Sequence, residues 1–257
     1  MKHLVIPDAH AKPECNKERF RWLGELILEE RPDKVICLGD FADMHSLCSY
    51  DRGTKGYSAR RYMDDINAAI EAQVVMFQPI ESYNRKQRMM KKKQWFPEFH
   101  MLYGNHDARI NRAIDLDETM LDGLISLDDL QYGNFGWYTY PFLDVVVLDG
   151  IAYSHYFVSG VMGRAIGGEN PAASMLNKHH MSCTSGHTHT FDVARRTRAD
   201  GAVIRGLVAG CYFEHHEKYA GPANDLWWRG VFIKDNVKDG DYELREISLQ
   251  TLREKYS

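Results

Sequence analysis

The sequence lacks the features that mark a secreted or membrane protein. None of its apolar runs is long enough to span a bilayer, and the N-terminus reaches the charged residue Asp8 too early for a signal peptide. The five cysteines are widely spaced, with neither a paired CxxC spacing nor a disulfide framework. We therefore expect a soluble, cytoplasmic protein whose cysteines are reduced thiols.

A strong net charge of either sign is also missing. The formal net charge is -4 over 257 residues, and the isoelectric point is close to 6.3. This charge gives no overall attraction to nucleic acid or to an anionic membrane, so any polyanionic partner must be held locally. The proportions of hydrophobic (44%) and charged (26%) residues are those of an ordinary globular chain.

Strand and helix patterns alternate in the first half of the chain. An apolar strand at 3–7, an amphipathic helix at 16–30 and a second strand at 34–38 form a β-α-β unit, so the two strands should run parallel. The further elements expected here are a helix over 59–78, a third strand that delivers Gly104, and a helix over 108–124.

Antiparallel hairpins are predicted in the second half, where Asp-Gly turns separate apolar runs at 145–154, 195–208 and 230–247. Parallel units followed by hairpins predict an α/β fold, a mixed two-sheet sandwich flanked by helices. The candidate functional residues extend from position 8 to position 189. We therefore expect residues 1–257 to form a single domain, with a helical insertion at about 44–96.

The residues best suited to bind metal ions follow short apolar runs, and strand ends are where open α/β sheets build active sites. They comprise four imidazoles, two carboxylates and one carboxamide: Asp8, His10, Asp40, Asn105, His155, His187 and His189. These are too many donors for one ion with an open position, but they suit two ions that share a bridging ligand. Asp40, in the middle of the series, is the natural bridge.

The nitrogen-rich donor set favours transition metals over Ca or Mg. We expect two divalent or trivalent ions of Mn, Fe, Zn or Ni, with Mn favoured. The series closes with Gly186-His187-Thr188-His189. On an extended strand, His187 and His189 would share one face and Thr188 would point away.

In this order the residues resemble the five motifs of the calcineurin-like metallophosphoesterases, over about positions 8 to 189. The matching segments are Asp8-Ala9-His10, Gly39-Asp40-Phe41-Ala42-Asp43, Gly104-Asn105-His106-Asp107, the isolated His155, and Gly186-His187-Thr188-His189. The resemblance implies that family's αββα fold and hydrolysis of a phosphoester by a metal-bridging hydroxide. It also implies one metal held by Asp8, His10 and His189, the other held by Asn105, His155 and His187, and Asp40 bound to both.

The resemblance further implies roles for two residues that bind no metal. His106 would protonate the leaving group or steady the phosphoryl oxygens. Asp43, three residues after the bridging Asp40, would orient that imidazole and raise its basicity.

The second motif departs from the protein serine/threonine phosphatase branch, in which an Arg and a Gly follow the second Asp and the Arg clamps the phosphate. Met44 and His45 stand in those places, and Asp51-Arg52-Gly53 comes several residues later. The loss of a fork-shaped phosphate ligand argues against protein phosphatase activity.

The motifs are more similar to the phosphodiesterase side of the family, which includes cyclic nucleotide phosphodiesterases and DNA-repair nucleases. We therefore expect a phosphodiesterase acting on a nucleotide or nucleic acid. The alternatives are a phosphomonoesterase, of the protein-phosphatase or nucleotidase type, and a metal-binding module without catalytic activity.

Fewer residues are candidates for contacting the substrate than for binding the metal ions. Arg109 and Arg112 stand three residues apart at the start of the helix expected after His106, where they could supply positive charge to a substrate. His45 follows the second motif closely and could reach the same substrate. Solvated helix arginines explain Arg109 and Arg112 equally well, and a satisfied polar loop histidine explains His45 better.

Two further features admit a functional interpretation. The run at 85–93 carries six basic residues beside Trp95 and Phe96, and it fits either a contact to a phosphate backbone or the solvated end of a helix. Trp227 and Trp228 precede a predicted strand, where adjacent side chains point to opposite faces. We expect one of them in the core and the other in the wall of a pocket.

Overall fold

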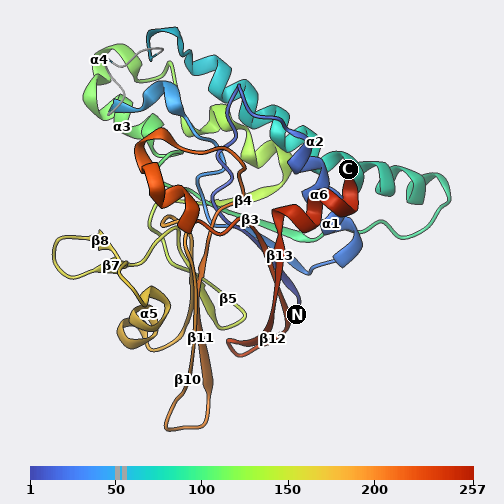
Figure 1. The fold of residues 1–257 in the computed structure, drawn as a ribbon. Helices are drawn as coiled ribbons and strands as arrows, with labels where there is room; N and C mark the ends of the chain where they lie inside the picture. Colours follow the sequence, from blue (N-terminus) through green and yellow to red (C-terminus); the bar gives the residue numbers. More distant parts are fainter. Residues whose placement is uncertain (50–52, 54–56) are drawn as a thin grey trace.

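The computed structural model describes residues 1–49, 53 and 57–257 (Figure 1). Asp51 and Arg52, which belong to the late Asp-Arg-Gly segment, lie outside the described residues. None of the helices in this part combines the length and the apolar character needed to cross a bilayer. All five cysteines are free, as expected.

The first sheet carries the parallel units predicted from the sequence. In spatial order its six strands are β13 (Asp241–Ser248), β12 (Gly230–Lys238), β1 (His3–Ile6), β2 (Lys34–Cys37), β3 (Glu98–Leu102) and β4 (Trp137–Tyr140). β1 to β4 run parallel, because a helical crossover joins each strand to the next. The antiparallel hairpin β12–β13 pairs with β1 at the other side.

The second sheet mixes parallel and antiparallel pairs. In spatial order its five strands are β10 (Phe191–Thr197), β11 (Val203–Ala209), β9 (Ser182–Ser185), β6 (Ile151–Tyr153) and β5 (Val146–Leu148). The hairpins β5–β6, β10–β11 and β12–β13 are the three that were predicted. In the β5–β6 turn Asp149 has φ 50° and Gly150 has φ 85°, as a type I′ turn requires.

Helices cover both sides of the two stacked sheets. α1 (Glu18–Glu30), α2 (Tyr62–Met89) and α6 (Leu249–Tyr256) lie on the side of the first sheet, and α5 (Pro171–His179) packs on the second (Figure 1). This arrangement confirms the predicted mixed α/β sandwich. The remaining elements are α3 (Arg109–Leu116), α4 (Glu118–Leu121), the hairpin β7 (Val158–Ser159) and β8 (Arg164–Ala165), and the 3₁₀ turns η1 (His45–Leu47), η3 (Tyr57–Ala59), η4 (Leu127–Leu130), η5 (Tyr132–Phe135) and η6 (Lys218–Leu226).

Two helices differ from the prediction by more than a few residues. The helix expected over 108–124 is interrupted at Asp117, whose φ of -148° and ψ of 61° are not helical. The helix expected to end near 78 continues through Pro79 to Met89, because α2 packs closely on α1 at this point. A Cβ atom at Gly24 of α1 would overlap the carbonyl oxygen of Met76 and approach the Pro79 ring. The segment 44–96 thus contains η1, η3 and α2, whose inner side joins the core.

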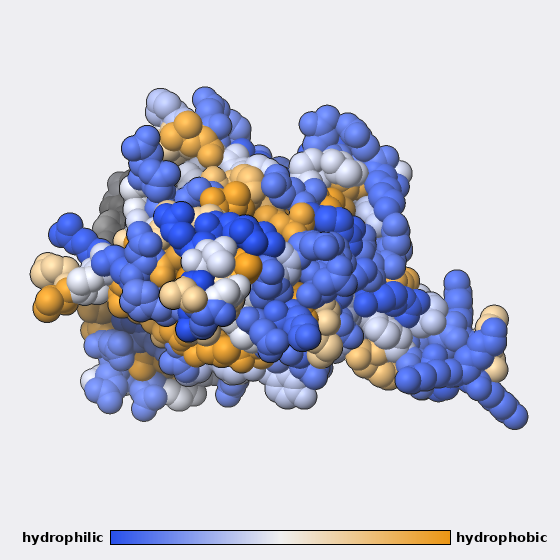
Figure 2. All heavy atoms as spheres, turned by 90° about the horizontal axis from the view of Figure 1, so that it is seen from below, coloured by the Kyte–Doolittle hydropathy of each residue, from blue (hydrophilic) through white to orange (hydrophobic). Residues whose placement is uncertain are grey.

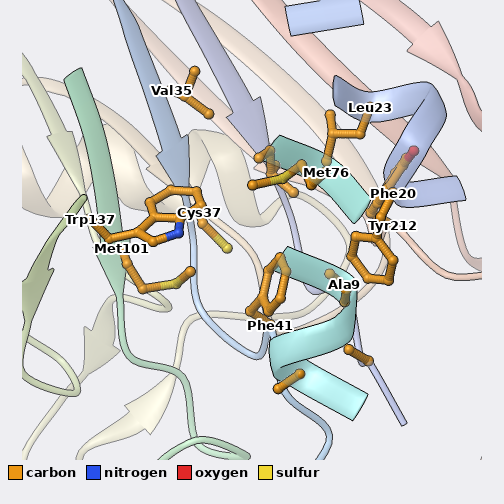
Figure 3. Packing of buried hydrophobic residues seen from close by; sticks show 14 of the residues in the cluster. Ala9, Phe20, Leu23, Val35, Cys37, Phe41, Met76, Met101, Trp137 and Tyr212 are labelled. Atoms are coloured by element: carbon orange, nitrogen blue, oxygen red, sulfur yellow. The ribbon is translucent and has the colours of Figure 1, made fainter. Parts of the chain in front are cut away.

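The central strands divide the core into two layers. Leu4 and Ile6 of β1 face the layer next to α1 and α2, whereas Val5 faces the second sheet, as alternation along a strand requires. Figure 3 shows the first layer, whose labelled side chains are Ala9, Phe20, Leu23, Val35, Cys37, Phe41, Met76, Met101, Trp137 and Tyr212. Because β1 and β2 are buried on both faces, the loops that leave their carboxyl ends start from fixed positions.

Candidate metal centre

All the predicted ligand residues lie in loops that follow the carboxyl ends of strands. The loops that carry them are those after β1 (Asp8 and His10), β2 (Asp40), β3 (Asn105), β6 (His155) and β9 (His187 and His189). β1, β2 and β3 are parallel to one another, and so are β6 and β9. The loops therefore converge at one edge of the sandwich, as expected for an open α/β sheet.

Asp8, His10 and His189 form the first group of the centre. Their ligand atoms lie within 4.8 Å of one another, and all three residues are buried. The Nε2 atom of His189 lies 3.0 Å from Oδ2 of Asp8. Both ring nitrogens of His10 are buried without a hydrogen-bond partner among the described residues. A buried imidazole with no partner is costly unless a ligand binds it, so this group fits a metal ion.

Asp40, His155 and His187 form the second group, again with ligand atoms within 4.8 Å of one another. The Nδ1 atom of His155 donates to the carbonyl oxygen of Leu38 at 2.9 Å, which leaves a lone pair on Nε2. Nδ1 of His187 lies 3.3 Å from that Nε2, and Oδ1 of Asn105 lies 2.8 Å from it. Electron-pair donors that converge in this way suit a cation.

Asp40 lies between the two groups. Its Oδ2 atom is 3.7 Å from Nε2 of His10 and 3.4 Å from Nε2 of His155, so one carboxylate is within reach of both. Burial lowers the pKa of His10 and that of His187 to about 4. Both imidazoles are therefore neutral near pH 7, which is the form that binds metal. The residues present thus fit two ions that share Asp40.

Four of these residues have left-handed backbone conformations, which are uncommon outside glycine: His10 (φ 44°), Asp40 (φ 50°), His187 (φ 70°) and His189 (φ 59°). The expectation that His187 and His189 lie on an extended strand is wrong. β9 ends at Ser185, and the backbone N–H of His187 then turns to the Asp8 carboxylate, 3.1 Å from each oxygen. Strained backbone of this kind concentrates at functional sites.

Two glycines permit the close approach of the loops. A Cβ atom at Gly104 would overlap the carboxylate of Asp40, and one at Gly186 would overlap the carboxylate of Asp8. The absence of a side chain at these two positions therefore leaves room for the carboxylates of Asp40 and Asp8.

Comparison with known proteins places this centre in a family. A family model described as calcineurin-like phosphoesterase matches residues 1–244. The chain belongs to this family. Its members are metal-dependent phosphoester hydrolases with a dinuclear centre. The clusters Asp8-His10-His189 and Asp40-His155-His187, two of the four possible metal-holding clusters among the described residues, agree with this.

Two solved structures are similar to the chain over most of its length. YfcE, a phosphoesterase from E. coli, is 12% identical over 97% of this chain and 100% of its own, with a TM-score of 0.39. TT1561 of Thermus thermophilus is 8% identical over 95% of this chain and 98% of its own, with a TM-score of 0.43. No curated protein matches the sequence. The assignment to the phosphoesterase family therefore rests on the family model.

Asp107 is a buried residue of the third motif to which the sequence assigned no role. Its carboxylate accepts the backbone N–H groups of Asp40 at 2.8 Å, Gly104 at 2.9 Å and Ala42 at 3.3 Å, together with the Tyr132 hydroxyl at 2.9 Å. Burial and the nearby charge of Asp40 raise the pKa of Asp107 to about 6. Asp107 therefore fixes the turn that presents Asp40, and its place in a recognised motif was the signal that pointed to it.

His106 and Asp43, predicted as the catalytic pair, are in contact. Nδ1 of His106 lies 2.8 Å from Oδ1 of Asp43, and the backbone N–H of His106 donates to Oδ1 of Asp40 at 2.7 Å. The Arg109 guanidinium donates to the carbonyl oxygen of Asp43 at 2.8 Å and lies 3.1 Å from Nε2 of His106. Because arginine can only donate, Nε2 accepts here and the Nδ1–H group donates to Asp43.

The charges of this pair depend on their neighbours. Burial alone would lower the pKa of His106, but the carboxylates of Asp40 and Asp43 outweigh it and raise this pKa above its usual value. Burial would likewise raise the pKa of Asp43, whereas its hydrogen bond to His106 and the nearby positive charge of Lys12 hold it well below its usual value. Asp43 is therefore ionised near neutral pH, which favours a protonated His106.

The other two predicted substrate residues belong to none of the clusters of possible metal ligands among the described residues. The Arg112 side chain is exposed on α3, and across the described ranges it makes no hydrogen bond or ion pair with the centre. Nδ1 of His45 lies 2.5 Å from Oδ1 of Asp65, and its Nε2 lies 3.5 Å from Glu14. Of the three, the structure brings only Arg109 to the catalytic pair.

A polar chain beside Asp43 and His10 was not predicted from the sequence. Nζ of Lys12 lies 2.9 Å from Oε1 of Glu217 and 3.6 Å from Oδ2 of Asp43. Nε2 of His215 lies 2.7 Å from the same Glu217 oxygen, and both residues have ligand atoms within 4.8 Å of His10. Lys12 adjoins the first motif, which was a usable signal. His215 and Glu217 reach the centre only through the tertiary fold.

Aromatic rings flank both groups of ligands. The Trp227 ring stands edge-on to His189, with the centroids 4.5 Å apart, and the Tyr156 ring lies 4.6 Å from that of His187. Trp228 instead stacks on Phe232 in the core, at 4.4 Å. Trp228 thus joins the core, as expected for one of the two tryptophans, and Trp227 lies beside a predicted metal ligand. The wall of a pocket stays a prediction for Trp227.

Replacing Gly186 with Ala is expected to weaken metal binding about ten- to hundred-fold, the usual effect of disturbing the residues around a metal ligand. The new Cβ atom would force the Asp8 carboxylate from its position. Titration of the metal-free protein with Mn²⁺, followed by calorimetry, measures the change. Gly133→Ala is the matched control, because a Cβ atom there meets nothing within 4 Å. Equal affinity in the two variants would contradict the role of Gly186.

Proposed function

We propose that this chain is a two-metal phosphodiesterase that acts on a nucleotide or nucleic acid. The observation that carries the diester assignment is the engagement of Arg109 with His106 and Asp43. Met44, in the place of the phosphate-clamping arginine of protein phosphatases, is fully buried. Among the described residues, no arginine is therefore left at the catalytic pair as a ready clamp for a phosphate dianion.

The charge balance around the metal ligands favours the same assignment. Lys12 and Arg109 are the cations beside the catalytic pair, and Asp43 and Glu217 are their anionic partners. A phosphomonoester carries nearly two negative charges near pH 7, whereas a diester carries one. Surroundings with balanced charges therefore suit the diester better than the monoester.

The residues of the two groups would hold the ions that the sequence predicted, Mn, Fe, Zn or Ni, with Mn favoured because oxygen and nitrogen donors are mixed. When bound, such ions supply Lewis-acid stabilisation of the phosphoryl oxygens and lower the pKa of water. Asp8, His10 and His189 would hold one ion and Asn105, His155 and His187 the other, with Asp40 shared.

His106 would give a proton from Nε2 to the leaving oxygen, while Asp43 keeps the imidazole oriented through Nδ1. Nε2 must carry a proton for this step, so the Arg109 guanidinium must turn away from it. Its other terminal nitrogen can keep its hydrogen bond to the carbonyl oxygen of Asp43 during this step. Trp227 and Tyr156 would then offer ring surfaces to a nucleoside beside the phosphate.

Hydrolysis of a matched pair of chromogenic esters tests the proposal. The protein, loaded separately with Mn, Fe, Zn and Ni, is given bis-p-nitrophenyl phosphate and p-nitrophenyl phosphate, and kcat/KM is measured for each. We expect the diester to be favoured by about tenfold or more, which corresponds to roughly 1.4 kcal/mol. Preference for the monoester would favour the phosphomonoesterase alternative. Stoichiometric metal without turnover of either ester would favour a binding module.

A further inference from the structure

The end of α2 and the loop after it form a basic arm, defined here as residues 85–96. The arm projects from the body of the molecule at the right of Figure 1, and the same extension in Figure 2 is covered mainly by hydrophilic side chains. Its six cations are all exposed or half-exposed: Arg85, Lys86, Arg88, Lys91, Lys92 and Lys93. No Asp or Glu occurs from 82 to 97, although the chain holds 36 acidic residues.

The cations of the basic arm have no acidic partners. None of the ion pairs formed within the described part of the chain includes any of the six. Uncompensated positive charge on a chain of net charge -4 is therefore concentrated at one extremity. Such a concentration attracts a polyanion locally, even though the molecule as a whole does not.

The basic arm is also held in a defined shape. The Asn84 side chain donates to the carbonyl oxygen of Trp95 at 2.8 Å and accepts the Trp95 backbone N–H at 2.9 Å, which fastens the loop to the helix. The Arg31 guanidinium lies 4.0 Å from the Tyr83 ring centroid and 4.8 Å from that of Trp95. Because the base of the arm is ordered already, little backbone entropy is lost when a ligand binds it.

Apolar side chains stand exposed among these cations. Phe96 is 72% exposed, Met89 is 79% exposed and Met90 is 61% exposed. Cations interleaved with an accessible aromatic ring are the combination that holds a single-stranded nucleic acid, since the cations contact phosphates and a base stacks on the ring. We propose that the basic arm binds single-stranded nucleic acid.

The position of the basic arm connects this surface to the metal centre. Asp65, in the first turn of α2, contacts His45. His45 lies only two residues after Asp43 in the sequence. The 28 residues of α2 then span roughly 40 Å to the arm. In a fully stacked strand, phosphates are about 3.4 Å apart, so about a dozen nucleotides at most cover this length. The inference that the arm tethers a polymeric substrate rests on the proposed phosphodiesterase activity, whereas binding itself does not.

Fluorescence anisotropy with a labelled oligodeoxythymidine 30-mer tests the binding, in EDTA so that no hydrolysis can occur. The arm variant replaces Lys91, Lys92 and Lys93 with Glu. The matched control replaces Lys178, Arg196 and Lys238 with Glu; these residues are exposed, belong to other elements and give the same net charge. We expect the arm variant to bind at least tenfold more weakly at 0.1 M salt, and the control to stay within twofold of the unmodified protein.

Salt dependence and stacking sharpen the test. Loss of three phosphate contacts should reduce the slope of log K against log salt by about 2, at about 0.7 per contact on a single strand. Phe96→Ala should weaken binding about fivefold or more without changing that slope. Failure of the 30-mer to bind, an equal loss in the control variant, or binding of phosphatidylserine vesicles in its place would overturn the proposal. So would polyglutamate binding as tightly as the oligonucleotide.

A separate measurement keeps the two proposals apart. The metal-loaded arm variant should hydrolyse bis-p-nitrophenyl phosphate like the unmodified protein, since α2 separates the arm from the centre, but it should cleave the 30-mer more slowly. Binding of the 30-mer through the arm by a protein that hydrolyses no diester would support the surface and reject the proposed function. Hydrolysis of the small diester without binding of the 30-mer through the arm would support the proposed function and reject the nucleic-acid-binding surface.

Discussion

Replacing Asp40 with Asn is expected to lower kcat/KM for phosphoester hydrolysis by roughly 10³-fold or more, or about 4 kcal/mol. The Oδ2 atom of Asp40 lies 3.7 Å from Nε2 of His10 and 3.4 Å from Nε2 of His155, within reach of ligands in both groups. The substitution removes its negative charge but leaves an oxygen that can still accept the backbone N–H of His106. The loop should therefore keep its conformation while both ions bind more weakly.

Elemental analysis of the purified Asp40→Asn variant distinguishes the weakening of both metal sites from damage to only one of them. We expect the content of both metals to fall together, because a shared carboxylate is lost. Asp200→Asn makes the same chemical change on the exposed β10–β11 turn, where the side chain pairs with Arg198, and it should change neither metal content nor rate. Loss of only one ion per chain from Asp40→Asn would show that Asp40 does not bridge.

The sheets were predictable because their strands are buried in a regular way. Val35 and Cys37 face the helices while Ile36 faces the second sheet, so β2 is apolar on both sides and reads as a continuous apolar run. The Asp149-Gly150 turn was predictable for a different reason, since both of its residues need positive φ. Local patterns of this kind predict where the strands end. The predicted metal ligands are the residues that follow these strand ends.

The helices were less predictable where packing overrides a local preference. Pro79 lacks the N–H group that a helix interior uses, which favours an end near 78. The contact with Gly24 of α1 lets the helix continue regardless, and this contact joins residues far apart in sequence. A single sequence contains no direct sign of which helix will pack there.

The candidate ligands could be predicted because metal binding restricts residue types, but the groups around them could not. Asp107 holds the Asp40 turn through backbone N–H groups from three residues, and such acceptors leave no spacing pattern. Glu217 reaches Lys12 only because the loop after β11 folds back over the first motif. The turn at His187 was missed for the same reason, since the Asp8 carboxylate that it binds lies 179 residues earlier.

Replacing His106 with Asn is expected to reduce kcat about 10²- to 10⁴-fold while both metals stay bound, as for the loss of a general acid. The imidazole belongs to neither predicted ligand group, although it shares a cluster of possible ligand atoms with His10 and Asp40 and its Nε2 is 3.9 Å from Oδ2 of Asp40. Rates for two thymidine diesters distinguish its roles. The loss should be larger for a dinucleotide than for a p-nitrophenyl ester, whose leaving group needs no proton. Equal losses would mean that His106 steadies the phosphoryl oxygens.

Asp43→Asn is expected to shift the pH dependence of kcat to lower pH while both metals stay bound. The Asp43 carboxylate helps raise the pKa of His106, so its loss should lower that pKa. A general acid is active while protonated, and kcat falls as pH rises through its pKa. The fall on the alkaline side should therefore begin at lower pH in the variant, with kcat nearer the unmodified value at acidic pH. A kcat reduced by the same factor at every pH would mean that Asp43 orients the imidazole without setting its charge.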